Sequence, residues 1–199
     1  MRTNRLEAFS DGVFAIVITL LVLDIRIPEV PYPNLPETLW GILPRIASYV
    51  LSFIVIGLYW VFHYVYFERI KFVNGTLLAL NLVGLLLISF MPIPTSLMGR
   101  YPLQSWPIVL YGLSLIAVNM TALVTVVYLQ RNPSLLREQL IQQDFKGQML
   151  VYVWVNVPYV LALVIAFVFP VLSYVIFLVI FVAVGFNTWR QLNTLRRVG

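Results

Sequence analysis

Residues 5–23 read RLEAFSDGVFAIVITLLVL, in which a charged opening passes directly into an apolar run broken only by Thr19. About 20 apolar residues suffice to cross a bilayer as a helix, so this stretch predicts a membrane-spanning helix over about residues 6–25. Ser10 and Asp11 lie at its mouth, where a carboxylate is costly against lipid and usually faces protein or water. We therefore expect both residues to have a structural or functional partner.

One face of this predicted helix is an aliphatic stripe. At about 100° per residue, Ile16, Leu20 and Leu23 lie within about 60° of one another, and Gly12 and Thr19 flank them. Isoleucine and leucine at spacings of four and three are also what any packed membrane helix shows. The spacing alone therefore leaves two interpretations open, a packing face and a pore-lining face.

Ser10 and Asp11 point away from this stripe, toward a different neighbour. Arg5 is six residues from Asp11, so the two do not form an i,i+4 pair. The carboxylate therefore needs a partner from another helix.

The composition of the 199 residues identifies an integral membrane protein. Hydrophobic residues make up 61% and charged residues 11%, and the mean hydropathy is +0.91. Soluble domains contain about 45–50% apolar and about 25% charged residues. No long polar region separates a second domain, so 1–199 is predicted to be a single all-α membrane domain. The net charge of +5 is assigned to basic loops beside the membrane and not to nucleic-acid binding.

Six membrane-spanning helices are predicted, with both termini on one side. Ten of the 13 basic residues would lie on the side of the termini, and only Arg26, Arg45 and Arg100 on the other. The positive-inside rule then places both termini in the cytoplasm of a multi-pass cell-membrane protein. The predicted spans are 6–25, 39–66, 73–91, 107–129, 148–168 and 171–189.

Prolines predict the conformation of the first outer loop and the end of the third span. The outer loop from Ile25 to Thr38 contains four prolines and is expected to be extended. Its acids, together with Asp24, either attract cations to an outer mouth or are simply solvated loop charges. The third span is expected to end at residues 91–94, where Pro92 and Pro94 follow each other closely.

The first helix resembles one family of channels. Arg5, Phe9, Ser10 and Asp11 form an R-x-x-x-F-S-D pattern at the start of the first of six spans. This pattern, with the apolar continuation GVFAIVITLLVL, is similar to that of the transmembrane-protein-175 potassium channels, the lysosomal channel of animals and its prokaryotic relatives. The resemblance implies a passive potassium channel, and the single repeat and short loops predict a prokaryotic member. Because animal members carry two six-helix repeats and work as dimers, it implies a homotetramer for a chain with one repeat.

The resemblance also implies where the pore lies. Four copies of the first helix would surround the axis, and rings of aliphatic side chains would form both constriction and filter. Aligned on the pattern, the ring positions are Ile16, Leu20 and Leu23, with Thr19 beside them, so that permeating K+ passes here without another metal or cofactor. No T-V-G-Y-G-like loop occurs in the sequence, which excludes the common carbonyl-lined filter.

The polar residues of the pattern are expected to tie helices together. Counted along helices at 1.5 Å per residue, Asp11 and His63 lie at the same depth, about 9 Å in from Arg5 and Arg69 respectively. We therefore predict a hydrogen-bonded network among residues of the first three spans. Two alternatives stay open: Asp11 as an ion-binding carboxylate in the pore, and His63 as a histidine with one satisfied hydrogen bond and no further role. The predicted network comprises Arg5, Ser10, Asp11, Trp60, His63 and Asn81.

Two other classes of function are weighed against the channel. A proton-coupled secondary cation transporter could use Asp11 and His63 as a relay, but no internal repeat and few midplane charges are present. A membrane-embedded enzyme is disfavoured because His63 is the sole histidine, cysteine is absent, and no nucleophile–base pair can be assembled. The sequence thus favours a potassium-permeable channel, with lipid and further copies of itself as partners.

Overall fold

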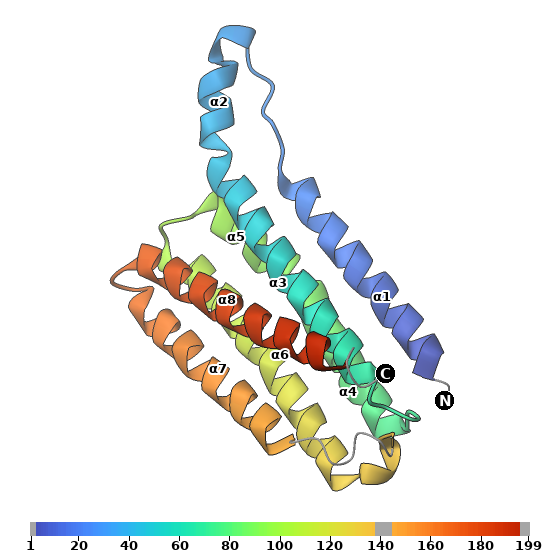
Figure 1. The fold of residues 1–199 in the computed structure, drawn as a ribbon. Coiled ribbons are helices and arrows are strands. Elements are labelled where there is room, and N and C mark those ends of the chain that lie inside the picture. Colours follow the sequence, from blue (N-terminus) through green and yellow to red (C-terminus); the bar gives the residue numbers. More distant parts are fainter. Residues whose placement is uncertain (1–2, 138–144, 196–199) are drawn as a thin grey trace.

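The computed structural model describes residues 3–137 and 145–195, with side chains described for 3–137 and 152–186. Its regular structure is helical, which confirms the predicted all-α class, and an isolated antiparallel bridge joins Ile70 to Leu136 (Figure 1). The α-helices are α1 (Thr3–Leu20), α2 (Leu35–Gly41), α3 (Leu43–Phe67), α4 (Gly75–Phe90), α5 (Pro92–Arg100), α6 (Ser105–Arg131), α7 (Phe145–Ile165) and α8 (Pro170–Leu195).

Four stretches are long and apolar enough to cross a membrane: Thr3–Asp24, Leu43–Phe67, Gly75–Arg100 and Ser105–Arg131. They correspond to the first four predicted spans. At the places of the fifth and sixth are α7, of 21 residues, and α8, of 26 residues, whose apolar parts within the described side chains are shorter. The chain is therefore membrane-embedded.

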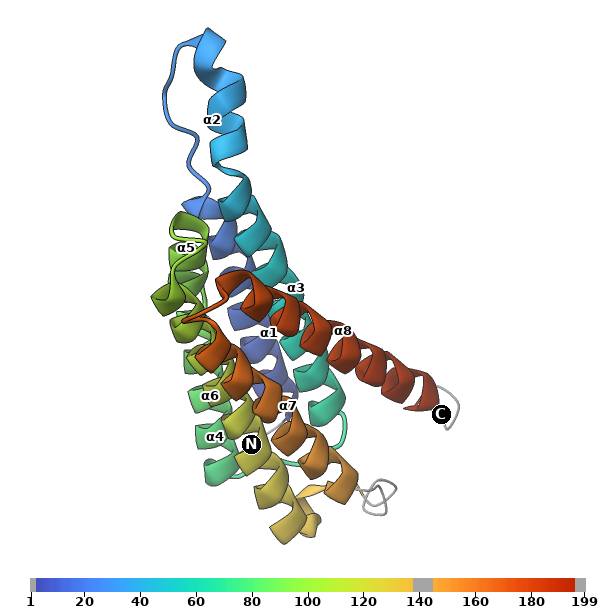
Figure 2. The same ribbon diagram turned by 90° about the vertical axis from the view of Figure 1, so that its left-hand side faces the viewer.

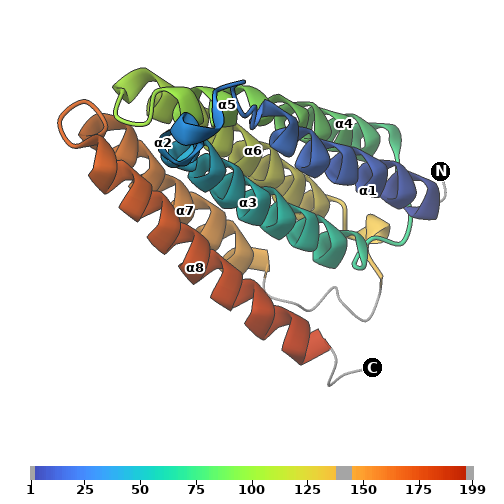
Figure 3. The same ribbon diagram turned by 90° about the horizontal axis from the view of Figure 1, so that it is seen from above.

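The helices form a bundle in which α1 lies at one side. It packs against α3 and α4, whereas α6 lies against α4, α5 and α7. Helices α7 and α8 are on the side of the bundle away from α1, as the view from above shows (Figure 3). The main apolar core joins these layers through buried residues such as Phe14, Val55, Leu85, Tyr111 and Phe177.

Prolines begin helices here where the sequence suggested that they end or prevent them. The helix α4 ends at Phe90, close to the expected residues 91–94, but after a single turn residue, Met91, a second helix, α5, continues the span to Arg100. Pro92 lies in the first turn of α5, where its missing N–H group removes no hydrogen bond. Pro36 likewise lies in the first turn of α2, so the loop between α1 and α2 is extended only as far as Pro31. This extended segment and α2 lie side by side and form an arm that projects beyond the bundle (Figure 2).

Candidate pore-lining helix

Helix α1 buries one face and leaves another uncovered. Phe14 and Val17 are buried in the main core, which fixes that face against α3 and α4. The predicted stripe is exposed instead: Ile16 is 59% exposed and Leu20 46%, and Leu23, in the 3-10 turn Leu21–Asp24 that continues α1, is 66% exposed. An aliphatic face of this kind, uncovered in a single copy, needs lipid, water or another protein surface beside it.

Thr19 lies beside this stripe and is exposed as well. Its hydroxyl donates to the carbonyl oxygen of Ile16 at 2.8 Å and also lies 3.1 Å from that of Ala15. The hydroxyl proton is therefore used within the helix, while the lone pairs of the oxygen stay available as acceptors. This is the side-chain oxygen that the predicted filter region contributes.

A buried chain of hydrogen bonds connects α1 to α4 and α3. Ser10 is fully buried, donates to the carbonyl oxygen of Leu6 at 2.8 Å, and accepts from Nδ2 of Asn81 at 3.1 Å. Oδ1 of Asn81 lies 2.8 Å from Nε2 of His63. Because an amide oxygen can only accept, Nε2 carries the proton in this contact. Three helices are thus joined through one asparagine.

A second link joins α1 to α3 nearer the surface. Nε1 of Trp60 donates to Oδ1 of Asp11 at 2.8 Å.

Aromatic rings fix the position of the His63 ring. The ring of Phe14 packs edge-on against it with centroids 5.5 Å apart, and the ring of Phe67 stacks on it with centroids 4.2 Å apart. The histidine therefore has both a polar partner and a fixed ring orientation.

The structure thus brings together five of the six residues of the predicted network, in two separate links. Arg5 is exposed and belongs to neither, because it lies about 140° around the helix from Ser10. Phe9, the aromatic residue of the pattern, is 54% exposed. It lies seven residues before Ile16, so it continues the exposed stripe by two helical turns.

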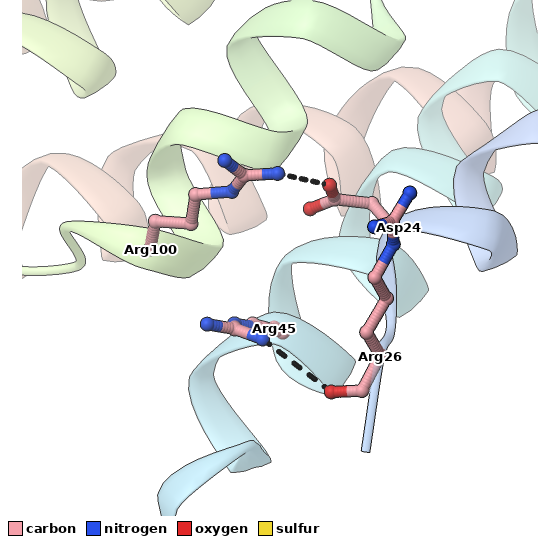
Figure 4. A network of polar contacts seen from close by, with 4 residues as sticks. All are labelled: Asp24, Arg26, Arg45 and Arg100. Carbon is pink, nitrogen blue, oxygen red and sulfur yellow. Dashed lines mark hydrogen bonds and ion pairs between the residues drawn. The ribbon is translucent and has the colours of Figure 1, made fainter. Parts of the chain in front are cut away.

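Sequence reasoning missed a polar contact at the opposite end of α1. Nη2 of Arg100, at the end of α5, lies 2.7 Å from Oδ1 of Asp24, and Nη1 of Arg45 lies 3.5 Å from the carbonyl oxygen of Arg26 (Figure 4). Asp24 is therefore paired within the chain and is not merely a solvated loop charge. The predicted spans gave no signal for this contact, because Arg100 falls in the predicted loop between the spans 73–91 and 107–129.

The fold and this site define a helical membrane protein whose first helix is held by polar ties and leaves an apolar stripe uncovered. Comparison with known proteins agrees with this class. The family model described as endosomal/lysosomal potassium channel TMEM175 matches residues 5–92. A potassium channel of Chryseobacterium sp. is 36% identical over 175 residues, covering 87% of each chain. The chain belongs to the TMEM175 family, a family of ion channels and not of enzymes.

Further relatives show how far the likeness extends. A potassium channel of Streptomyces collinus is 45% identical over 103 residues, 50% of this chain and 48% of that one. The human protein named endosomal/lysosomal proton channel TMEM175 is 37% identical over 111 residues, which cover 50% of this chain and 22% of its own length. A crystal structure of a lysosomal potassium-selective channel TMEM175 homolog from Chamaesiphon minutus matches with a TM-score of 0.82 at 26% identity, covering 94% of this chain and 97% of that one.

Proposed function

We propose that four copies of this chain form a passive potassium-permeable channel, with α1 of each copy around the central axis. The observation that carries this proposal is the stripe of α1. Ile16, Leu20 and Leu23 are exposed in the single chain although the opposite face of the same helix is packed in the core. Potassium is the ion named for the bacterial relatives and for the Chamaesiphon structure.

The proposed filter is a set of apolar rings. A narrow hydrophobic constriction excludes ions by dewetting, because it removes hydration water without replacing it. Rings of Ile16, Leu20 and Leu23 would act in this way and discriminate among partly hydrated cations by width. The oxygen of Thr19, with its free lone pairs, would offer the permeating K+ a local acceptor. K+ is the only ion that the mechanism requires, and no cofactor takes part.

The hydrogen-bonded links set the direction in which the stripe points. Asp11 is bonded to Trp60 and Ser10 to Asn81, from two neighbouring helices. A helix held from two directions cannot rotate about its own axis without breaking one of these bonds. We assign Ser10, Asp11, Trp60, His63 and Asn81 to this positioning role, so Asp11 is a tie and not an ion-binding carboxylate.

The proposed topology has six spans in the cell membrane, with both termini cytoplasmic. The distribution of basic residues supports it. In the fold, α1 begins at the end of the bundle where α3 ends and α4 begins, near Arg69 and Lys71 (Figure 1). The arm that carries α2 and the Asp24–Arg100 pair then lies on the outer side.

Potassium flux in liposomes tests the proposal. Purified protein reconstituted into potassium-loaded vesicles should release K+ down its gradient when a protonophore clamps the pH difference, and crosslinking should trap four copies. Flux that stops without a proton gradient would favour the alternative, a proton-coupled transporter. An active, well-behaved monomer would reject the shared pore.

Proton permeation is a second candidate activity because the human relative is named a proton channel. It is measured in the same vesicles with an internal pH-sensitive dye and valinomycin to clamp the voltage. Acidification that depends on the protein and is altered by Leu23→Ala would assign protons to the same path.

A further inference from the structure

A partly open cavity of about 170 Å³ lies among the helices of the subunit, and no residue of the exposed stripe of α1 lines it. Its walls come from α1, α3, α4, α6, α7 and α8, and α1 contributes Phe14. Along α3 the lining runs from Val55 to Phe67, about 18 Å at 1.5 Å per residue. Most of the wall is apolar, with Phe62, Leu85 and Phe181 among its residues. The cavity is therefore long and largely hydrophobic.

Three buried polar atoms in this wall lack a partner. Within the described residues, Oη of Tyr66, Nε of Arg69 and Nδ2 of Asn119 accept or donate no hydrogen bond, and all three residues line the cavity. Native proteins rarely leave buried polar groups unpaired. Each of the three can donate a hydrogen bond. Tyr66 and Arg69 are three residues apart, so one acceptor group at this end of the cavity could serve both, whereas Asn119 is bonded to Tyr59 farther along α3.

Arg69 adds a buried positive charge at one end of the cavity. Its residue is only 6% exposed, and no carboxylate pairs with it in the part of the chain that the structure describes. Burial lowers the pKa of its guanidinium, but arginine stays protonated at physiological pH. The backbone around it is fixed, since Arg137 N–H donates to the carbonyl of Arg69 at 3.0 Å. A fixed buried cation calls for an anion beside it.

Arg69 also stands where lipid head groups are found. It lies two residues beyond the end of α3, a candidate span that ends at Phe67. Basic pockets at the ends of spans are favourable places for acidic head groups. Water alone would leave the charge uncompensated, and it wets apolar walls poorly.

We propose that this cavity binds the hydrocarbon chain of an anionic membrane lipid, with the acid group of the lipid against Arg69. The apolar wall along α3 takes the chain, and the donors of Tyr66 and Arg69 take the acidic oxygens. His63 and Asn81 also line the cavity, so the occupant would touch residues of the ties that hold α1. An effect of the bound lipid on conduction rests on the proposed function, whereas the binding of the lipid to the cavity does not.

Native mass spectrometry after reconstitution tests the site. The protein is placed in nanodiscs of phosphatidylcholine with phosphatidylglycerol, released, and its retained lipids are counted. The wild type should keep one phosphatidylglycerol per subunit. Ala122→Leu, which fills the cavity, and Arg69→Gln should each lower retention about tenfold, as expected for the loss of about 1.4 kcal/mol. Ala183→Leu, on an exposed position of α8 outside the lining, is the matched control.

The outcomes separate the sources and the alternatives. Retention of added oleate in place of phosphatidylglycerol would support the same chemistry from a free fatty acid. Equal retention in the wild type and in Ala122→Leu would overturn the proposal, because the lipid would then lie on the surface. Retention of phosphatidylcholine that Arg69→Gln leaves unchanged would overturn the anionic part. Arg69→Lys, which keeps the charge, separates a binding defect from misfolding, and lipid retention without potassium flux would reject the pore while leaving this site.

Discussion

Nε1 of Trp60 on α3 lies 2.8 Å from Oδ1 of Asp11 on α1 and donates a hydrogen bond to it. One residue earlier in α1, Ser10 is bonded from a different helix by Asn81 at 3.1 Å. The carboxylate is therefore bound on the side of α1 that meets its neighbours. The exposed aliphatic stripe points elsewhere. This separation of tied and uncovered faces makes the role of each residue testable on its own.

Removing the donor to Asp11 should weaken the fold without changing selectivity. Trp60→Phe keeps an aromatic ring but loses Nε1–H, and because Trp60 is 41% exposed we expect a loss of about 1–2 kcal/mol. Thermal unfolding in detergent measures the loss, and the K+/Na+ permeability ratio should stay at the wild-type value. Asp11→Asn keeps an oxygen that can accept from Nε1 of Trp60, so it should lose less stability and likewise leave the permeability ratio unchanged. A changed ratio in a fully assembled Asp11→Asn channel would make this carboxylate an ion site.

Substitutions in the exposed stripe of α1 should change ion selectivity and leave assembly intact. Leu23→Ala widens one proposed ring, and Ile16→Asn makes another polar, so both should lower discrimination between K+ and Na+ while the protein still assembles. Reversal potentials under bi-ionic conditions measure this. Leu161→Ala, at a 54% exposed leucine of α7 on the other side of the bundle, is the control. Unchanged ratios in both stripe variants would remove α1 from the filter.

Much about α1 could be predicted from the sequence, because the exposed stripe and the depth of each side chain follow from residue spacing along a helix. The helical period defines the stripe, and counting residues along two antiparallel helices places Asp11 and His63 at one depth. Arg5 is the exception, since its place in the pattern says nothing about which way it points. A residue of the family pattern can thus lie outside the contacts that its neighbours make.

The Asp24–Arg100 pair could not be predicted in this way. It depends on the helical stretch continuing past Met91 as α5, which carries Arg100 to Asp24, just beyond the C-terminal end of α1. Pro92 and Pro94 suggested an end to the helix, because a proline is disfavoured inside a helix and favoured in its first turn. Whether these prolines end a helix or begin the next one depends on the backbone turn at Met91. No sequence motif around Met91 predicts that turn.

The buried chain through Asn81 should contribute more to stability than the link to Asp11. Asn81→Ala leaves both Ser10 and His63 without this partner, and a buried polar group left unpaired costs about 1–3 kcal/mol. Ser10→Ala removes only the acceptor for Nδ2 and should cost less. Chemical or thermal unfolding of the two single variants and the double variant gives the comparison. Additive losses would show that Ser10 and Asn81 do not interact and would contradict a connected chain.

Close packing of α5 on α3 should make Gly99 intolerant of a methyl group. A Cβ atom there would lie 2.9 Å from Cα of Arg45, a backbone atom that cannot move aside cheaply. Gly99→Ala should therefore destabilise by about 1–3 kcal/mol. Gly57→Ala, where nothing lies within 4 Å, should be neutral or gain up to about 1 kcal/mol. Equal stabilities of the two variants would contradict the close approach of α5 to α3.

The pair at the outer end of α1 is exposed enough to be sensitive to salt. The side chains of Arg100 and Asp24 are 52% and 28% exposed, so Arg100→Asp alone should lower the melting temperature more at low than at high ionic strength. Arg45, whose guanidinium lies near the same end of α1 (Figure 4), makes Asp24→Arg unfavourable for the same reason. The exchanged double variant restores opposite charges across the gap and should recover part of the loss. If it recovers none while both single variants fold, the contact does not anchor this end of α1, and the packing of buried residues such as Leu21 against the core must hold it instead.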